Sequence, residues 1–304
     1  MKWNERLIRG VLLCESHVEF RKEKGVIADA VSRVADNGFF GAISIAEIDN
    51  REDRKRIRDI VETHGIFLTQ WETMVIGDEG LNLCALDSRL RDRSVCRIRE
   101  LIELAAETGV RNVGLLCGPD PGAALRAEAT IVVCESLGTL CEATSRHPDM
   151  RLMIEPLDRD VHKKGLVGPT PEAVALLDRL KKSHSNVGLS LDTSHAVLLD
   201  EDPADTLDML APHLLEIHLS NPVLDRSSPY YGDYHIPPGP PGVLDVPDFT
   251  RVLKHGTRPG TLPGPVPVSA EVRSPRGGDP WETVELCAST LRRVLDDMES
   301  GTNQ

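Results

Sequence analysis

The sequence predicts a single (β/α)₈ TIM barrel that spans residues 1–304 as one domain. Short apolar runs rich in Val, Ile and Leu alternate with longer segments of helical period, which is the pattern of repeated βα units. A chain of 304 residues is also the ordinary size of one such barrel. A doubly wound open sheet would give a similar local pattern, but eight successive pairs favour the closed barrel.

The strand candidates recur along the whole chain and are too short for helices. They cover residues 10–14, 41–45, 66–71, 112–117, 151–155, 187–192, 214–219 and 266–271. The helix candidates cover residues 26–37, 51–63, 89–108, 123–146, 171–182, 203–210, 246–255 and 281–298. Thr170 and Pro171 give one helix a capping side chain and a proline at its first position. Glycines follow three other helices where a left-handed cap is wanted, at positions 38, 65 and 109.

A proline-rich segment interrupts the alternation after the seventh predicted strand. Residues 221–244 contain six prolines, which exclude a helix or a central strand. Loops that follow barrel strands lie at the C-terminal mouth, where such barrels keep their chemistry. We therefore predict an ordered active-site loop at 221–244.

The charge balance of the chain is acidic. Asp and Glu number 48 against 35 Lys and Arg, which gives a formal net charge of -13. Such a surface is not built to neutralise the phosphates of a nucleic acid, so we expect a small-molecule partner and no nucleic acid. The oligomeric state stays open, and a homo-oligomer is compatible with the sequence.

Cysteine usage and the N-terminus bear on the compartment. The seven cysteines are scattered without a CxxC pair, so they predict neither a disulfide framework nor a cysteine zinc site. The N-terminus is charged, and the apolar run at 11–14 is too short for a signal peptide. No stretch approaches the roughly 20 apolar residues that a membrane span needs. We expect a cytoplasmic protein with no membrane partner.

Four consecutive predicted strands end on, or close to, a side chain that can bind a metal. These residues are Glu155, Asp192, His218 and Glu271. Polar side chains at the ends of buried strands project toward the barrel mouth, so we expect the four to converge there. The alternative is that each is an ordinary polar residue facing solvent. Four such residues in succession favour a shared site, because charges directly after apolar strands are costly unless paired or bound to metal.

Three carboxylates and one imidazole form a mostly oxygen-rich ligand set. This set suits one divalent metal ion, with Mn²⁺ as the first choice and Mg²⁺, Co²⁺ or Zn²⁺ as alternatives.

The same residues carry a resemblance to a known superfamily. The run Glu155-Pro-Leu-Asp-Arg159 resembles the Glu-Pro-Leu-Asn-Arg run of ketose 3-epimerases and their relatives in the xylose-isomerase-like superfamily. Asp192-Thr-Ser-His195 is similar to its Asp-x-x-His after strand six, and residues 238–245 resemble its Pro-Gly-x-Gly-x-x-Asp turn. His218 and Glu271 stand where its ligands from strands seven and eight belong. The first half of the chain is similar only in its βα pattern.

The resemblance implies a divalent-metal-dependent sugar isomerase or epimerase, and the residue types support that chemistry. A metal would chelate a carbonyl and a neighbouring hydroxyl of a sugar-like substrate and stabilise the enediolate formed on proton loss. Glu155 and Glu271, on opposite sides of the metal, would remove and return the proton. Return to the same carbon gives epimerisation, and return to the adjacent carbon gives aldose to ketose isomerisation.

Five further residues are candidates for substrate binding, each with a structural alternative. His195 would bond a substrate oxygen or lie on the surface at a helix start, and Arg273 would bind an oxyanion or pair with an acid. Trp71 would wall the sugar ring or belong to the core. Asp233 and His235 would touch substrate, close the mouth or support the loop.

Several positions depart from the epimerase pattern and bear on substrate choice. Its asparagine is Asp158 here, its second glutamate is Val161, and its arginine after the strand-seven histidine is Leu224, with Arg226 nearby. We expect the metal chemistry to survive and the substrate to differ. Two acids near other strand ends are expected to be solvated loop residues, Glu47 and Glu72.

Three other functions compete with the isomerase. A lyase or dehydratase acting on an oxidised sugar, an inosose or a glycoside starts with the same proton abstraction and ends in elimination. An apurinic endonuclease of this superfamily would use Asp233 and His235 for a multinuclear zinc site, but the early-strand histidines are absent and the charge is unsuited to DNA. The third is a barrel that binds a sugar without turnover.

Overall fold

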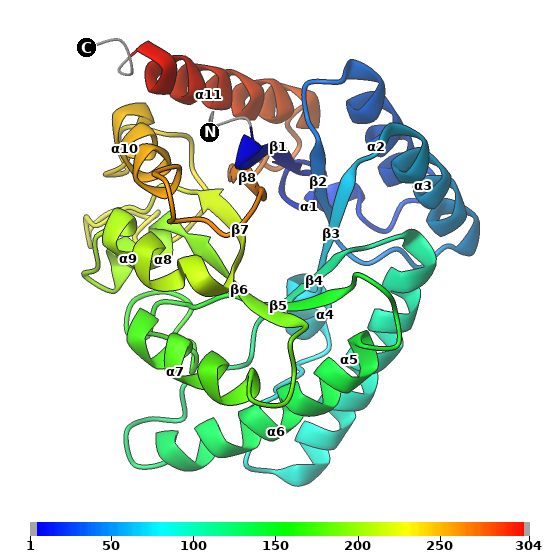
Figure 1. Ribbon diagram of the computed structural model, residues 1–304, viewed down its shortest axis with the longest axis vertical. Coiled ribbons are helices and arrows are strands. Elements are labelled where there is room, and N and C mark those ends of the chain that lie inside the picture. Colours follow the sequence, from blue (N-terminus) through cyan, green and yellow to red (C-terminus); the bar gives the residue numbers. More distant parts are fainter. Residues whose placement is uncertain (1–4, 301–304) are drawn as a thin grey trace.

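The computed structural model describes residues 5–300, which form a closed barrel of parallel strands surrounded by helices (Figure 1). The strands pair in chain order, and the eighth returns to the first. They are β1 (Leu7–Leu12), β2 (Ala42–Ile45), β3 (Phe67–Trp71), β4 (Asn112–Leu115), β5 (Arg151–Ile154), β6 (Val187–Asp192), β7 (Leu214–Leu219) and β8 (Val266–Ala270). The predicted (β/α)₈ barrel is confirmed.

An outer layer of helices covers the barrel, and each predicted helix is present with small shifts at its ends. They are α2 (Val26–Asn37), α3 (Arg51–His64), α5 (Ser88–Thr108), α6 (Arg126–Thr144), α7 (Thr170–Leu180), α9 (Pro203–Leu210), α10 (Val246–Gly256) and α11 (Pro280–Ser300). Each buries one apolar face against the strands; in α5 that face includes Ile98, Leu101 and Ile102, which are fully buried. No helix in the described part of the chain is long and apolar enough to cross a membrane.

Three short helices directly after strands were not predicted, because four to six residues show no helical period. They are α1 (Leu13–Ser16), α4 (Thr73–Asp78) and α8 (Thr193–Leu198). Two single turns of 3₁₀ helix were also not predicted, at Val18–Phe20 and Ala211–His213. The short helices matter for function, because they begin at the mouth and aim the residues that follow the strands.

The predicted bounds of the first strand, 10–14, are wrong, because the observed strand lies nearer the N-terminus. β1 begins at Leu7, because residues 7–11 pair with residues 266–270 of β8. Arg9 lies inside this strand, and its guanidinium lies 4.6 Å from the centre of the Phe39 ring. The strand then ends at Leu12, and Leu13 starts α1.

The proline-rich segment 221–244 is ordered without helix or regular strand, as predicted. The side chain of Asn221 holds it: Nδ2 donates to the carbonyls of Pro237 and Gly239, both at 2.8 Å. Its Oδ1 accepts from the N–H of Leu244, also at 2.8 Å. A Cβ on Gly242 would lie 2.2 Å from Asn221 Oδ1, so only glycine fits beside this clamp.

A second glycine seats an aromatic side chain at the mouth. A Cβ on Gly114 of β4 would lie 2.6 Å from atoms of the Trp71 ring, which lies across the neighbouring strand. Trp71 packs there with Cys14 and Met153 in a small apolar cluster separate from the main core. Gly114 thus leaves room for the indole beside the pocket that Trp71 lines.

The expectation that Glu47 and Glu72 are solvated is wrong. Glu72, at the start of α4, is fully buried, and Glu47 is nearly so. Burial raises the pKa of Glu72 to about 8; a hydrogen bond from Gln70 Nε2 opposes this rise, and the charge of Glu47 adds to it. Glu72 is therefore a protonated carboxyl at neutral pH in the folded chain.

Glu72 is expected to make the fold less stable as the pH rises. The unfolded chain loses this proton near pH 4.5 and the folded chain near pH 8, so the unfolding free energy falls by up to about 1.4 kcal/mol per pH unit between them. Glu72→Gln should therefore be more stable than the wild type at pH 8, with the difference vanishing toward pH 4.5. Urea unfolding at a series of pH values measures this, with Glu135→Gln on the exposed side of α6 as control. A pH-independent difference would contradict the buried carboxyl.

Candidate metal centre

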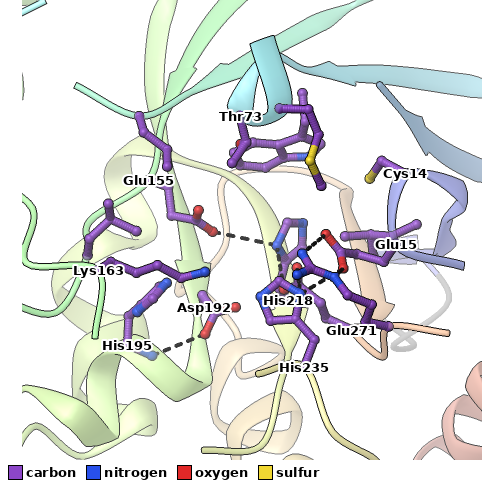
Figure 2. A pocket seen from close by; sticks show the side chains of 16 residues that line it. Cys14, Glu15, Thr73, Glu155, Lys163, Asp192, His195, His218, His235 and Glu271 are labelled. Carbon is purple, nitrogen blue, oxygen red and sulfur yellow. Dashed lines mark hydrogen bonds and ion pairs between the residues drawn. The ribbon is translucent and has the colours of Figure 1, made fainter. Parts of the chain in front are cut away.

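The four strand-end candidates line one pocket at the C-terminal mouth of the barrel (Figure 2). Asp192 is the last residue of β6 and His218 lies within β7. Glu155 and Glu271 directly follow β5 and β8. Successive strands of a closed barrel place these ends on one rim, so residues far apart in sequence converge.

The potential ligand atoms face one another closely enough to share a cation. Single ligand atoms of Asp192, His218 and Glu271 lie within 4.8 Å of one another, and so do those of Glu155, Asp192 and His195. His218 Nδ1 is 3.2 Å from Glu271 Oε2 and 3.7 Å from Glu155 Oε1, so the two glutamates approach it from two sides. The predicted convergence is thus observed.

Unpartnered buried atoms at this place fit a metal ion. His218 Nδ1 and Glu271 Oε2 are buried and have no hydrogen-bond partner among the described residues. Buried polar atoms are normally satisfied, and these two lie 3.2 Å apart, so their placement fits ligation of a shared cation. Its oxygen-rich composition suits hard and borderline divalent metals.

A buried glutamate lies behind the imidazole of His218. Glu216 precedes it by two residues on the same side of β7, and Glu216 Oε1 lies 3.4 Å from His218 Nε2. Ser44 and Thr69 donate to the Glu216 carboxylate at 2.9 and 3.0 Å. A carboxylate behind a histidine commonly directs the other ring nitrogen at a metal. We did not predict Glu216, although a charge inside an apolar strand was visible in the sequence.

Asp192 is a candidate metal ligand and also caps the short helix α8. Its Oδ1 accepts from the N–H groups of Ser194 and His195 at 2.6 and 3.1 Å, and from the hydroxyl of Ser220. The cap fixes the carboxylate plane and leaves Oδ2 outside these hydrogen bonds. Burial raises the pKa of Asp192 to about 7; the His195 charge opposes the rise and the Glu271 charge adds to it.

His195 is buried, which rules out the surface alternative. Its Nδ1 is 3.3 Å from a carboxylate oxygen of Asp158, which is itself fully buried. Burial opposes the imidazolium, but Asp158, Asp192 and Asp233 outweigh it and raise the pKa of His195 to about 9. His195 lines the pocket as a cationic donor.

The far side of the pocket is built from a chain of alternating acids and bases. His235 Nε2 is 2.9 Å from Asp233 Oδ2, and His235 Nδ1 is 2.8 Å from Glu15 Oε2. Arg273 Nε and Nη2 donate to both oxygens of Glu15 at 2.6 and 2.9 Å. Arg273 therefore forms an ion pair with an acid, which was the structural alternative to substrate binding. It also lines the pocket.

Two charged residues of this pocket were missed in the sequence, Glu15 and Lys163. Glu15 lies in α1, which the predicted strand at 10–14 concealed, although a buried acid three residues after a strand was a usable signal. Lys163 lies eight residues beyond Glu155 in a loop with no periodic pattern. Asp233 supports the pocket from behind His235 and is almost completely buried.

Trp71 forms one wall of the pocket beside the metal ligands. Its ring centre is 5.2 Å from that of His218, and its indole N–H has no hydrogen-bond partner among the described residues. Leu224 and Arg226 are exposed and do not line the pocket, so Arg226 does not replace the arginine of the epimerase pattern. The loop 221–244 reaches the pocket through His235.

Comparisons with known structures agree with this geometry at the level of the fold. A D-tagatose 3-epimerase-like protein superposes with a TM-score of 0.72 at 19% identity, over 97% of this chain and 100% of that one. The IOLI protein with a bound zinc atom gives 0.72 at 14% identity, over 96% and 99%. A family 2 AP endonuclease from Brucella melitensis gives 0.61 at 18% identity, over 90% and 96%. No curated protein matches the chain.

Family membership follows from the sequence match. The family model described as the xylose isomerase-like TIM barrel matches residues 31–282, which is most of the chain and includes the four strand-end candidates. The chain belongs to the xylose isomerase-like TIM barrel family.

Proposed function

We propose that the chain is a divalent-metal-dependent isomerase or epimerase that moves a proton next to the carbonyl of a sugar-like substrate. The observation that carries this proposal is the placement of two carboxylates, Glu155 and Glu271, on two sides of His218, whose Nδ1 has no hydrogen-bond partner among the described residues. The similarity to a D-tagatose 3-epimerase-like protein supports the same class of reaction.

The metal would be held by Glu155, Asp192, His218 and Glu271. When bound, a divalent cation would draw electron density from the carbonyl and acidify the neighbouring C–H. Mn²⁺ is our first choice from the ligand set, and the zinc atom in the IOLI protein keeps Zn²⁺ among the alternatives with Mg²⁺ and Co²⁺.

The chain itself would supply the proton transfer and the binding of substrate. Glu155 and Glu271 face the pocket from two strand ends, so one can take a proton from one face of a carbon while the other returns it on the opposite face. His195 is a buried donor beside them and would hold a substrate oxygen. Trp71 would cover the apolar face of the sugar, and His235 and Arg273 would close the far side, with Asp233 holding His235 in place.

A panel of ketoses, inosose-like ketones and oxidised glycosides in deuterium oxide tests this function. We expect the purified chain to contain a divalent metal and to exchange a C–H proton next to the carbonyl for deuterium without loss of a leaving group. Mass spectrometry detects the exchange, and elemental analysis detects the metal. Release of water or an aglycone would instead establish the lyase or dehydratase. Metal-free protein that fails to exchange with any added cation would disprove the proposal.

A further inference from the structure

The loop after β5 is built around Asp158 and points one lysine into the pocket. The Asp158 carboxylate accepts hydrogen bonds from the backbone N–H groups of Val161, His162 and Lys163. Lys164 then takes a left-handed conformation with φ of 54°, which reverses the chain. Lys163 is thereby turned inward and lines the pocket, whereas Lys164 is exposed.

The Lys163 ammonium ends beside the metal centre, between Glu155 and Asp192 (Figure 2). Its ion-pair partner among the described residues is Asp233, whose Oδ2 is 3.3 Å from Nζ. Asp233 is shared, because the same oxygen lies 2.9 Å from His235 Nε2 and 3.7 Å from His195 Nε2. An ammonium has three donors, so one shared carboxylate oxygen does not satisfy it.

Arg273, the other permanent cation of the pocket, is satisfied. It holds both oxygens of Glu15 in a two-point ion pair, so its charge is compensated within the chain. Lys163 is therefore the permanent cation of the described pocket whose donors are incompletely paired. The charges of Glu155 and Glu271 also act on it, and its open donors can still bond a further oxyanion.

The sequence around the pocket also departs from the epimerase pattern. Val161 stands where that pattern has a second glutamate, and Leu224 faces solvent where it has an arginine. Two polar groups expected around a neutral ketose are thus missing, and a cation enters from the same loop. We propose that Lys163 binds a carboxylate of the substrate and that the substrate is a sugar acid; this assignment rests on the proposed function.

Two matched ligands test the role of Lys163 by direct binding. D-fructuronate differs from D-fructose in a carboxylate that replaces the terminal CH₂OH. In calorimetric titrations of the Mn²⁺-loaded protein, D-fructuronate should bind at least about tenfold more tightly, as expected for a hydrogen bond to a charged group. Lys163→Met should remove this preference and Lys163→Arg should retain most of it. Lys164→Met, the exposed neighbour, should behave as the wild type.

The outcomes separate this assignment from the proposed function. A preference that persists in Lys163→Met would show that the metal or Arg273 holds the carboxylate, and equal affinities in the wild type would show that no carboxylate is bound. Either result overturns the assignment and leaves the proton-transfer function standing. A Lys163-dependent preference in a protein that takes up no metal would overturn the proposed function alone. Metal content and thermal unfolding of each variant verify that the centre and the fold are intact.

Discussion

Replacing Asp192 with asparagine is expected to remove the bound divalent cation and to lower proton exchange by roughly a thousandfold, since a metal supplies several kcal/mol of charge stabilisation. The asparagine Oδ1 still accepts from Ser194 and His195, so α8 should keep its cap. The loss then reports the missing charge and not local unfolding. Elemental analysis and deuterium exchange measure the two effects.

Asp202 offers a matched control for this change. It caps α9 through the N–H groups of Ala204 and Asp205, in the same manner as Asp192 caps α8, but it lies outside the pocket. Asp202→Asn should keep full metal content and full exchange. Asp192→Asn with undiminished metal would show that the cation, if present, binds elsewhere.

Replacing the two glutamates one at a time is expected to leave proton exchange on only one face of the substrate carbon in each variant. Glu155→Gln and Glu271→Gln should each lower net epimerisation by about 10²–10⁴-fold, the range for loss of a positioned acid or base. Each variant keeps one carboxylate, so each should still exchange deuterium into one epimer, and the two variants should prefer opposite epimers. Both are assayed at saturating Mn²⁺, because each change also removes a proposed ligand.

The epimer that each variant exchanges shows whether the reaction uses one base or two. Exchange by one variant and none by the other would point to a single base, as in an aldose to ketose isomerase, and exchange of the same epimer by both would show that neither glutamate is the base. Turnover of every tested substrate at the wild-type rate in Glu271→Gln would refute a catalytic role for this residue.

The barrel and its strand-end residues could be predicted because each depends on a short, local signal. The run before Asp192 carries no charged residue and is apolar apart from Ser190, so the first charged residue marks the strand end and the barrel mouth. The match of the predicted bounds 187–192 and 214–219 to β6 and β7 shows how strong that signal is in the second half of the chain.

The rest of the pocket depends on tertiary folding that leaves little trace in the sequence. Glu15 enters it because the chain bends into α1 after β1, and Lys163 enters because Asp158 gathers three backbone N–H groups. Glu72 looks like a loop residue, yet the folded chain buries it fully. Such positions follow no period, so pattern reasoning does not reach them.

The Asn221 clamp sets the thermodynamic cost of filling the pocket. Flexible loops lose conformational entropy when a ligand orders them, and that loss is subtracted from the affinity. Here three hydrogen bonds from one side chain order the loop in advance, and the loop carries His235 with it. A ligand therefore meets a preorganised wall, and more of its interaction energy is retained as affinity.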